Sequence, residues 1–131
     1  MSSIFTKIVQ GDIPSYKVAE NVQFLAFLDI NPLEKGHTLV IPKQETDYIF
    51  DLQDDLLAEM MIFAKSVALG IEKTINCARI GVAVIGLEVP HAHIHLVPIN
   101  GVHDIDFSKS RVQLNKHEFQ RLAEQIRKAI I

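Results

Sequence analysis

The sequence predicts an α+β fold: a five-stranded antiparallel sheet with a long helix and short terminal helices packed on one side. Five short apolar runs are separated by spacings that suit hairpins, which favours antiparallel pairing. One long stretch with helical periodicity stands between the third and fourth runs. The 131 residues, 48% hydrophobic and 22% charged, are typical of one globular domain. We therefore expect a single domain over residues 1–131.

The first part of the chain predicts a short helix followed by three strands. Ser2 or Ser3 can cap a helix over residues 4–9, which Gly11 and Pro14 end. The three strands are expected at residues 17–20, 24–28 and 37–41. The loop between the second and third strands is rich in Asp, Asn, Pro and Gly, as loops are.

The second part predicts the longest helix, two strands and a final helix. The long helix is expected to begin at Asp51 or Gln53 and to continue to about Ile75. Its apolar stripe is broad, so it should pack on the sheet and also on a second surface. Two strands and a polar connection should follow, at residues 80–85, 91–97 and 101–113. Asn115 and Glu118 form a capping pair for the last, amphipathic helix.

Charge and composition exclude several classes of function. The formal net charge is −3 and there is no basic stripe, which argues against a nucleic-acid partner. No apolar run approaches the roughly 20 residues that a membrane span needs, and the N-terminus lacks a leader-like apolar segment. Cys77 is the single cysteine, which fits a reducing compartment. We expect a cytoplasmic protein that does not contact a membrane.

The most informative motif is a row of alternating histidines, His91, His93 and His95, within a run of Ala, Ile, Leu and Val. In a strand, these three side chains would share one face, about 6.6–7 Å apart along the chain. A core strand has no need of three titratable rings, each with a donor and an acceptor to satisfy. The pattern therefore indicates proton transfer, nucleophilic attack or metal binding.

A metal site and a purely structural role remain alternatives to catalysis. Two histidines at alternate positions of a strand can hold zinc with a third ligand from elsewhere. Three such side chains fan outward, however, and the outer two lie on the order of 13 Å apart at the backbone. Convergence on one ion is poor in that arrangement, so we expect neither a metal nor a cofactor.

Residues 91–97 match the signature H-φ-H-φ-H-φ-φ, in which φ is apolar, and so resemble the histidine triad (HIT) family of nucleotide hydrolases and transferases. Three other segments look like the family's N-terminal segment, central strands and loop: residues 4–14, 26–32 and 36–43. The resemblance covers about residues 4–98 and is to the Hint-like nucleotide hydrolases. It implies a HIT-like fold and a homodimer.

The resemblance also implies a pocket for a purine nucleotide similar to AMP. By position, the apolar residues against the base would be Ile4, Phe5, Ile8, Phe27, Leu28, Ile30 and Leu39. Gly86 and Val89, from the loop before the histidines, would contact the nucleotide too. Asp29 would accept hydrogen bonds from both ribose hydroxyls. Plain core packing is the alternative for Ile8 and Leu39, and a turn-initiating role is the alternative for Asp29.

The family's chemistry assigns a role to each histidine. His93 would attack the α-phosphorus, with its other ring nitrogen held by a backbone carbonyl near the first histidine. A nucleotidyl-histidine intermediate would form, and water would cleave it. His91 and His95 would bind phosphate oxygens and assist proton transfer. His37 would add a polar contact nearby.

Two departures from the family pattern concern the N-terminus and the phosphate end of the site. Ser3 and Thr6 stand where some bacterial relatives carry a C-x-x-C pair that helps to hold a structural zinc. Gly86 is followed by Leu87 and Glu88, where Hint-like members place Gln and then Ser or Thr. In an extended chain, Leu87 would face the same side as the histidines and Glu88 would face away. A nucleotide-binding adaptor with weak or vestigial catalysis is therefore the alternative to a hydrolase.

Overall fold

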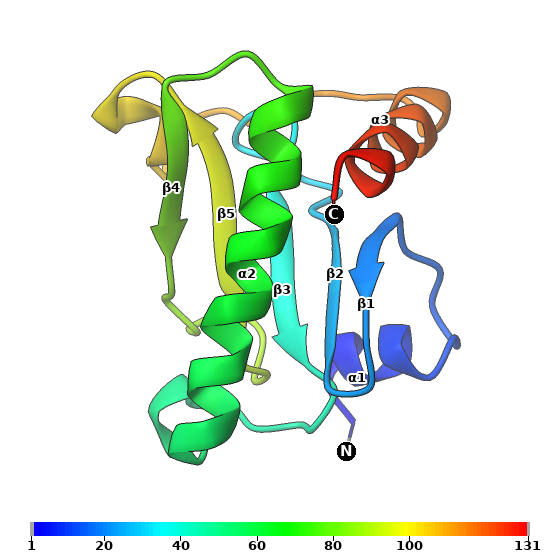
Figure 1. Ribbon diagram of the computed structural model, residues 1–131, viewed down its shortest axis with the longest axis vertical. Helices are drawn as coiled ribbons and strands as arrows, with labels where there is room; N and C mark the ends of the chain where they lie inside the picture. Colours follow the sequence, from blue (N-terminus) through cyan, green and yellow to red (C-terminus); the bar gives the residue numbers. More distant parts are fainter. Residues whose placement is uncertain (1, 131) are drawn as a thin grey trace.

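The computed structural model describes residues 2–130 as an α+β fold built on one five-stranded antiparallel sheet (Figure 1). The spatial order of its strands is β1-β2-β3-β5-β4. The strands are β1 (Lys17–Glu20), β2 (Phe24–Leu28), β3 (Thr38–Pro42), β4 (Arg79–Ala83) and β5 (Ile94–Ile99). The predicted sheet is confirmed, and the first two strands have the predicted bounds.

Three α-helices and two short 3-10 helices complete the fold. The helices are α1 (Ile4–Val9), α2 (Asp54–Thr74), α3 (Lys116–Ala129), η1 (Ile49–Asp51) and η2 (Val102–Ile105). The Ser3 hydroxyl caps α1 by accepting the N–H of Thr6 at 3.0 Å. At the start of α3, Asn115 Oδ1 accepts the Glu118 N–H while Glu118 Oε1 accepts the Asn115 N–H, which confirms the predicted capping pair.

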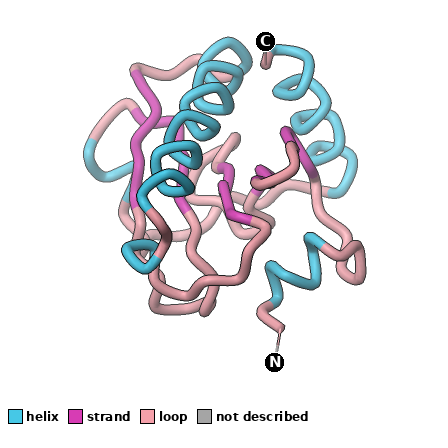
Figure 2. Tube along the Cα trace, turned by 60° about the horizontal axis from the view of Figure 1, so that its bottom comes forward, coloured by secondary structure: helices cyan, strands magenta, loops and turns pink. Residues whose placement is uncertain are grey.

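Helices cover both faces of the sheet rather than one. The core beneath α2 and α3 takes alternate strand residues, among them Phe24, Ala26, Val40 and Ile94. The intervening residues of β2 and β3 face α1 on the opposite side of the sheet; these are Leu25, Phe27, Leu39 and Ile41. In Figure 2 the strands lie between α1 and the two long helices. The expectation of helices on one side is therefore wrong for α1, because Phe5 and Ile8 bury themselves against the opposite face.

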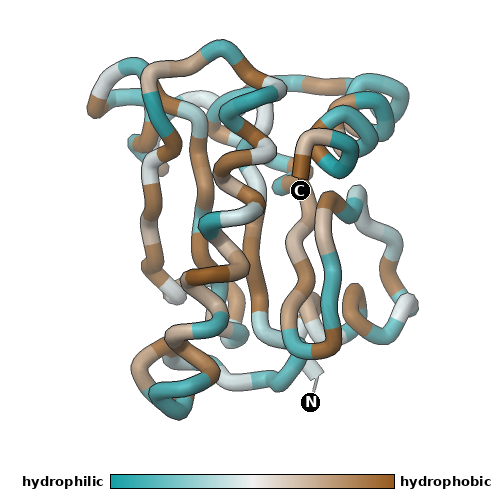
Figure 3. Tube along the Cα trace, viewed as in Figure 1, coloured by the Kyte–Doolittle hydropathy of each residue, from teal (hydrophilic) through white to brown (hydrophobic). Residues whose placement is uncertain are grey.

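Burial on both faces explains why the central strands are almost continuously apolar. Every residue of β2 and of β3 is buried. Figure 3 shows mainly hydrophobic residues along the central strands and a mixture of hydrophobic and hydrophilic residues along α2 and α3. Across residues 2–130, no helix combines the length and the apolar character that crossing a membrane requires.

The histidine strand begins later than predicted, at Ile94, so only His95 of the three histidines lies within it. The β3–β5 ladder ends at the pair Val40 and Ile94, and the next alternate pair would join Pro42 to Ala92. Proline has no N–H to donate, and the Ala92 N–H bonds instead to the Thr46 carbonyl oxygen at 2.6 Å. Residues 84–93, which precede β5, therefore form a loop that is not paired with β3.

Candidate active site

His93 lies in this loop, immediately before β5, with one ring nitrogen held and the other free. Its Nδ1 is 2.7 Å from the backbone oxygen of His91. A carbonyl only accepts, so Nδ1 carries the proton and Nε2 keeps its lone pair. The ring packs edge-to-face on Phe5, with ring centres 5.1 Å apart. This arrangement leaves a fixed imidazole with a nucleophilic nitrogen.

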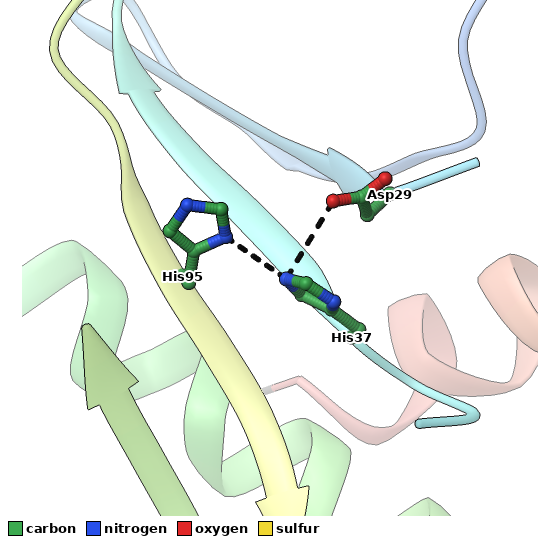
Figure 4. Close-up of side chains that lie close together, drawn as sticks. All are labelled: Asp29, His37 and His95. Carbon is green, nitrogen blue, oxygen red and sulfur yellow. Dashed lines mark hydrogen bonds and ion pairs between the residues drawn. The ribbon is translucent and has the colours of Figure 1, made fainter. Parts of the chain in front are cut away.

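His37 and His95 form a hydrogen-bonded pair (Figure 4), and a backbone N–H sets the tautomer of His37. The Leu33 N–H donates to His37 Nδ1 at 3.0 Å, so the proton of His37 is on Nε2. This Nε2–H donates to His95 Nδ1 at 2.9 Å, and His95 therefore carries its own proton on Nε2. Burial lowers the pKa of His37 to about 3 and that of His95 to about 4. Both rings are neutral near pH 7, and His95 offers an Nε2–H donor.

His91 is fully buried, and its ring contacts only protein groups. Its Nε2 donates to the Pro42 carbonyl oxygen at 2.7 Å, and its Nδ1 accepts from the Ser3 hydroxyl at 2.8 Å. Because both ring nitrogens have protein partners, this geometry favours a structural role for the His91 ring over the expected contact with a phosphate oxygen, which stays a prediction. His91 instead contributes its backbone oxygen, which holds His93. As predicted, the three rings lie on one side of the chain, and His91 and His93 both contact Phe5.

A cavity of about 240 Å³ opens beside His93 and His95 on the α1 side of the sheet. It is lined by nine of the ten residues expected at the nucleotide: Ile4, Phe5, Ile8, Phe27, Leu28, Asp29, Ile30, Leu39 and Val89. Ile4 and Ile30 are exposed at its rim, and Phe5, Ile8 and Leu39 are buried in its wall. The tenth residue, Gly86, lies outside this cavity.

Asp29 lies where the cavity meets the histidines. Its Oδ1 accepts the Asn31 N–H at 2.8 Å, so the turn-initiating interpretation is confirmed. Its Oδ2 is 3.6 Å from His37 Nε2 (Figure 4). Burial raises the pKa of this carboxyl, and the Asn31 hydrogen bond and the Arg111 charge oppose that rise. One carboxylate oxygen is therefore used by the turn and the other faces the histidine pair.

Comparison with known proteins agrees with this geometry. The family model described as the HIT domain matches residues 10–102. The chain belongs to the HIT family. An adenosine 5'-monophosphoramidase from Schizosaccharomyces pombe is 36% identical over 128 residues, which covers 96% of each chain. One from Saccharomyces cerevisiae is 38% identical over 96 residues, covering 72% of this chain and 61% of that protein.

The fold is likewise that of solved HIT structures. A zinc-bound histidine triad family protein from Mycobacterium smegmatis superposes with a TM-score of 0.84 at 29% identity. The superposition covers 99% of this chain and 94% of the other. The HIT-like α+β fold inferred from the histidine motif is thus confirmed.

A second cavity, of about 190 Å³, adjoins His93 and His95 on the side where the family resemblance implies the phosphate. Gly86, Leu87 and Glu88 line it, together with Phe107 and Arg111. Leu87 lines this cavity with the histidines, as expected, but the expectation that Glu88 faces away is wrong. Alternation does not hold here because residues 84–90 are not a strand, and Gly86 turns the chain with φ +77°. Glu88 accordingly lines both cavities, and the Leu87 side chain is largely exposed.

Sequence reasoning missed Phe107 and Arg111, which come from the connection after β5. Arg111 Nη1 donates to the Asn31 carbonyl oxygen at 2.9 Å, and its guanidinium stacks over the Phe107 ring at 5.8 Å. Neither residue has a distinctive spacing, because contacts with Asn31, His37 and His95 place them in the site. The remaining signal was a lone arginine in a polar connection, which is too weak to identify a site.

Asp29, His37 and His95 also converge closely enough to suggest a metal site, with one ligand atom of each within 4.8 Å of the others. The hydrogen bonds argue against it. His37 Nδ1 accepts the Leu33 N–H, so a metal on His37 Nε2 would displace the only ring proton. We therefore interpret His37 and His95 as a hydrogen-bonded pair with the Asp29 carboxylate beside it, and the absence of a bound metal stays a prediction.

Proposed function

We propose that this HIT protein hydrolyses purine nucleotides at the α-phosphate, with nucleoside 5'-phosphoramidates as the substrate class and His93 as the nucleophile. One observation carries the proposal: His93, whose Nδ1 is held by the His91 carbonyl oxygen, lines both the apolar cavity and the second cavity that contains Arg111. The similarity to the fungal adenosine 5'-monophosphoramidases supports the leaving-group class.

In the proposed reaction, His93 Nε2 forms a bond to the α-phosphorus while the bond from phosphorus to the leaving nitrogen breaks. The leaving nitrogen takes up a proton from solvent and departs as an amine. Water then attacks the phosphorus of the nucleotidyl-histidine, a proton is released, and the neutral ring is restored. The His95 Nε2–H stabilises negative charge on a phosphate oxygen during both steps.

The nucleoside is proposed to bind in the α1-side cavity. Its base would pack against the buried wall that includes Phe5, Phe27 and Leu39, and its ribose hydroxyls would donate to Asp29. Because Asp29 Oδ1 already accepts one backbone N–H, its second oxygen carries most of this recognition. Apolar side chains form no hydrogen bonds that distinguish adenine from guanine. The substrate panel below therefore compares adenosine and guanosine compounds.

Arg111 is proposed to supply the positive charge at the phosphate end. Leu87 has no hydrogen-bond donor, in contrast to the family's glutamine. Arg111 lines the same cavity as His93 and His95, and its contacts to the Asn31 and Phe107 carbonyl oxygens fix the guanidinium there. A fixed guanidinium suits phosphate oxygens. Such a contact would serve phosphate binding in a hydrolase and in an adaptor alike.

A second copy of the chain is proposed to cover β4 and one side of α2. β4 is an edge strand with no partner beyond it among residues 2–130. Exposed apolar side chains lie on β4 and the residues after it, Val82, Val84 and Ile85, and on α2, Met61, Ile62 and Leu69. A cavity of about 760 Å³ lies between α2 and the residues after β4 and reaches His93. An unpaired edge with apolar neighbours is typical of a two-fold interface.

A substrate panel tests the proposed function. Purified protein is assayed with adenosine and guanosine 5'-phosphoramidates and with dinucleoside polyphosphates, and the binding of AMP is measured by calorimetry. The hydrolase predicts multiple turnovers with at least one phosphoramidate. Binding of AMP without turnover of any member of the panel would favour the adaptor instead.

A further inference from the structure

A polar cluster at the N-terminus contacts the histidine loop and takes no part in the reaction proposed above. It consists of Ser3 and Thr6, at the start of α1, and Glu45, which follows β3. Glu45 Oε1 is 2.6 Å from the Ser3 backbone nitrogen and 2.6 Å from the Thr6 hydroxyl. The Ser3 hydroxyl is 2.8 Å from His91 Nδ1. The cluster therefore joins three segments that are far apart in the sequence.

The direction of each hydrogen bond in the cluster follows from the groups that can only accept. The Glu45 carboxylate accepts from the Ser3 N–H and from the Thr6 hydroxyl, which commits the Thr6 proton to Glu45. These two hydrogen bonds hold the pKa of Glu45 below its usual range, so the carboxylate stays charged. The Ser3 hydroxyl accepts the Thr6 N–H at 3.0 Å and donates its own proton to His91 Nδ1.

His91 is thereby held as a single neutral tautomer. Nδ1 accepts from Ser3, and Nε2 donates to the Pro42 carbonyl oxygen at 2.7 Å. With both ring nitrogens fixed, the backbone of His91 is fixed as well. Its carbonyl oxygen is the group that holds Nδ1–H of His93.

We propose that Glu45, acting through Ser3 and Thr6, is a positioning residue that fixes His91 so that the His91 carbonyl oxygen aims Nε2 of His93 at the phosphorus. The inference rests on the proposed function for its kinetic consequence, but not for its structural one. Removing the Glu45 carboxylate releases the Ser3 N–H and the Thr6 hydroxyl, which also lies 3.3 Å from His91 Nδ1. Removing the Thr6 hydroxyl takes away one of the two donors that hold Glu45. Either change loosens the Ser3 hydroxyl on His91 Nδ1. His91 can then rotate, and His93 can lose the bond that fixes its tautomer.

Kinetics of three variants and a control test the proposal. Glu45→Ala removes the acceptor, Thr6→Val removes the hydroxyl at nearly constant volume, and Thr6→Ser retains it. We expect kcat for adenosine 5'-monophosphoramidate to fall about 10- to 100-fold in the first two, because small displacements of a nucleophile are costly. KM should change little, and Thr6→Ser should stay close to wild type. The control, Glu20→Gln, removes an exposed carboxylate paired with Lys43 at 2.8 Å and should leave kcat unchanged.

Nitrogen NMR of the histidine rings supplies a measurement that does not depend on turnover. In the wild type, His91 should be protonated on Nε2 and His93 on Nδ1. In Glu45→Ala, both rings should show mixed tautomers while circular dichroism remains that of the folded protein. Unchanged tautomers, or an equal loss of kcat in Thr6→Ser and Thr6→Val, would overturn the inference. If the wild type shows no turnover, the proposed function fails, and the tautomers still decide this inference.

Discussion

The histidines of the site are oriented mainly by backbone groups. His37 accepts from the Leu33 N–H, His91 donates to the Pro42 carbonyl oxygen, and His93 donates to the His91 carbonyl oxygen. Backbone atoms cannot change their protonation state, so each tautomer is set by the fold itself. The consequence is a site whose ring nitrogens keep fixed donor and acceptor roles.

Neutral buried histidines predict that acid destabilises the fold. The ordinary histidine pKa is 6.5, and burial lowers it to about 3 in His37 and about 4 in His95. Below 6.5 the unfolded chain therefore binds more protons than the folded chain, so the free energy of unfolding falls as the pH falls. We expect His37→Gln to flatten this slope between about pH 6.5 and 5. Urea titrations across that range measure it.

Burial raises the pKa of Asp29, so protonation of this carboxyl favours the folded chain and opposes the effect of the histidines. The test therefore compares the pH slope of each variant with that of the wild type. The control is His117→Gln, at an exposed position of α3, which should keep the wild-type slope. Equal slopes for wild type and His37→Gln would show that His37 is not held neutral.

Arg111 predicts a selective effect on charged ligands. If its guanidinium meets the phosphate, Arg111→Gln should weaken AMP binding about tenfold or more, since hydrogen bonds to charged groups contribute roughly 1.5–3 kcal/mol. Adenosine, which has no phosphate, should bind as before. Calorimetry with both ligands measures the difference, and Arg121→Gln, an exposed position on α3, is the control. An equal loss for adenosine would assign Arg111 to loop packing instead.

At the scale of elements, the sequence predicted most of the scaffold because local signals and packing agree there. Apolar runs bounded by turn residues located β1 and β2 to the residue, and the Asn115–Glu118 pair located α3. The nucleotide-side residues followed from the family resemblance, and nine of them do share one cavity.

The errors lie where tertiary contacts decide. The pairing between β3 and β5 stops before Pro42, which lies in β3 and is about 50 residues from β5 in the sequence. The residues near β5 therefore carry no signal that the strand begins late. The positive φ of Gly86 invalidated an argument from strand alternation. Arg111 and Glu45 enter the site from loops, and their partners are 80 and 39 residues away in the sequence.

The loop before β5 carries a prediction of its own. Leu87 lines the phosphate-side cavity without a hydrogen-bond donor. One positioned donor to developing charge is worth roughly 10²–10³ in rate in well-studied sites. We expect slow turnover in the wild type, and in Leu87→Gln an increase in kcat of about tenfold or more with little change in AMP affinity. Steady-state kinetics measure it; a fast wild type and a neutral or harmful Leu87→Gln would show that other groups serve the phosphate.

For the whole molecule, the exposed face of β4 and α2 predicts a homodimer at micromolar concentration. Burying this apolar edge removes unpaired strand groups and exposed Val82 and Ile62 from water. Val82→Lys places a charge at the centre of the face and should give monomers. Sedimentation velocity measures both states, and a monomeric wild type at that concentration would contradict the proposal.

The central claim is that His93 carries the nucleotide during the reaction. Rapid quenching of wild-type protein with a nucleoside 5'-phosphoramidate, followed by mass spectrometry of its peptides, measures this directly. We predict a nucleotidyl adduct on His93, no adduct and no turnover in His93→Ala, and AMP binding close to wild type in that variant. Turnover near the wild-type rate in His93→Ala, or an adduct on a different residue, would contradict the account.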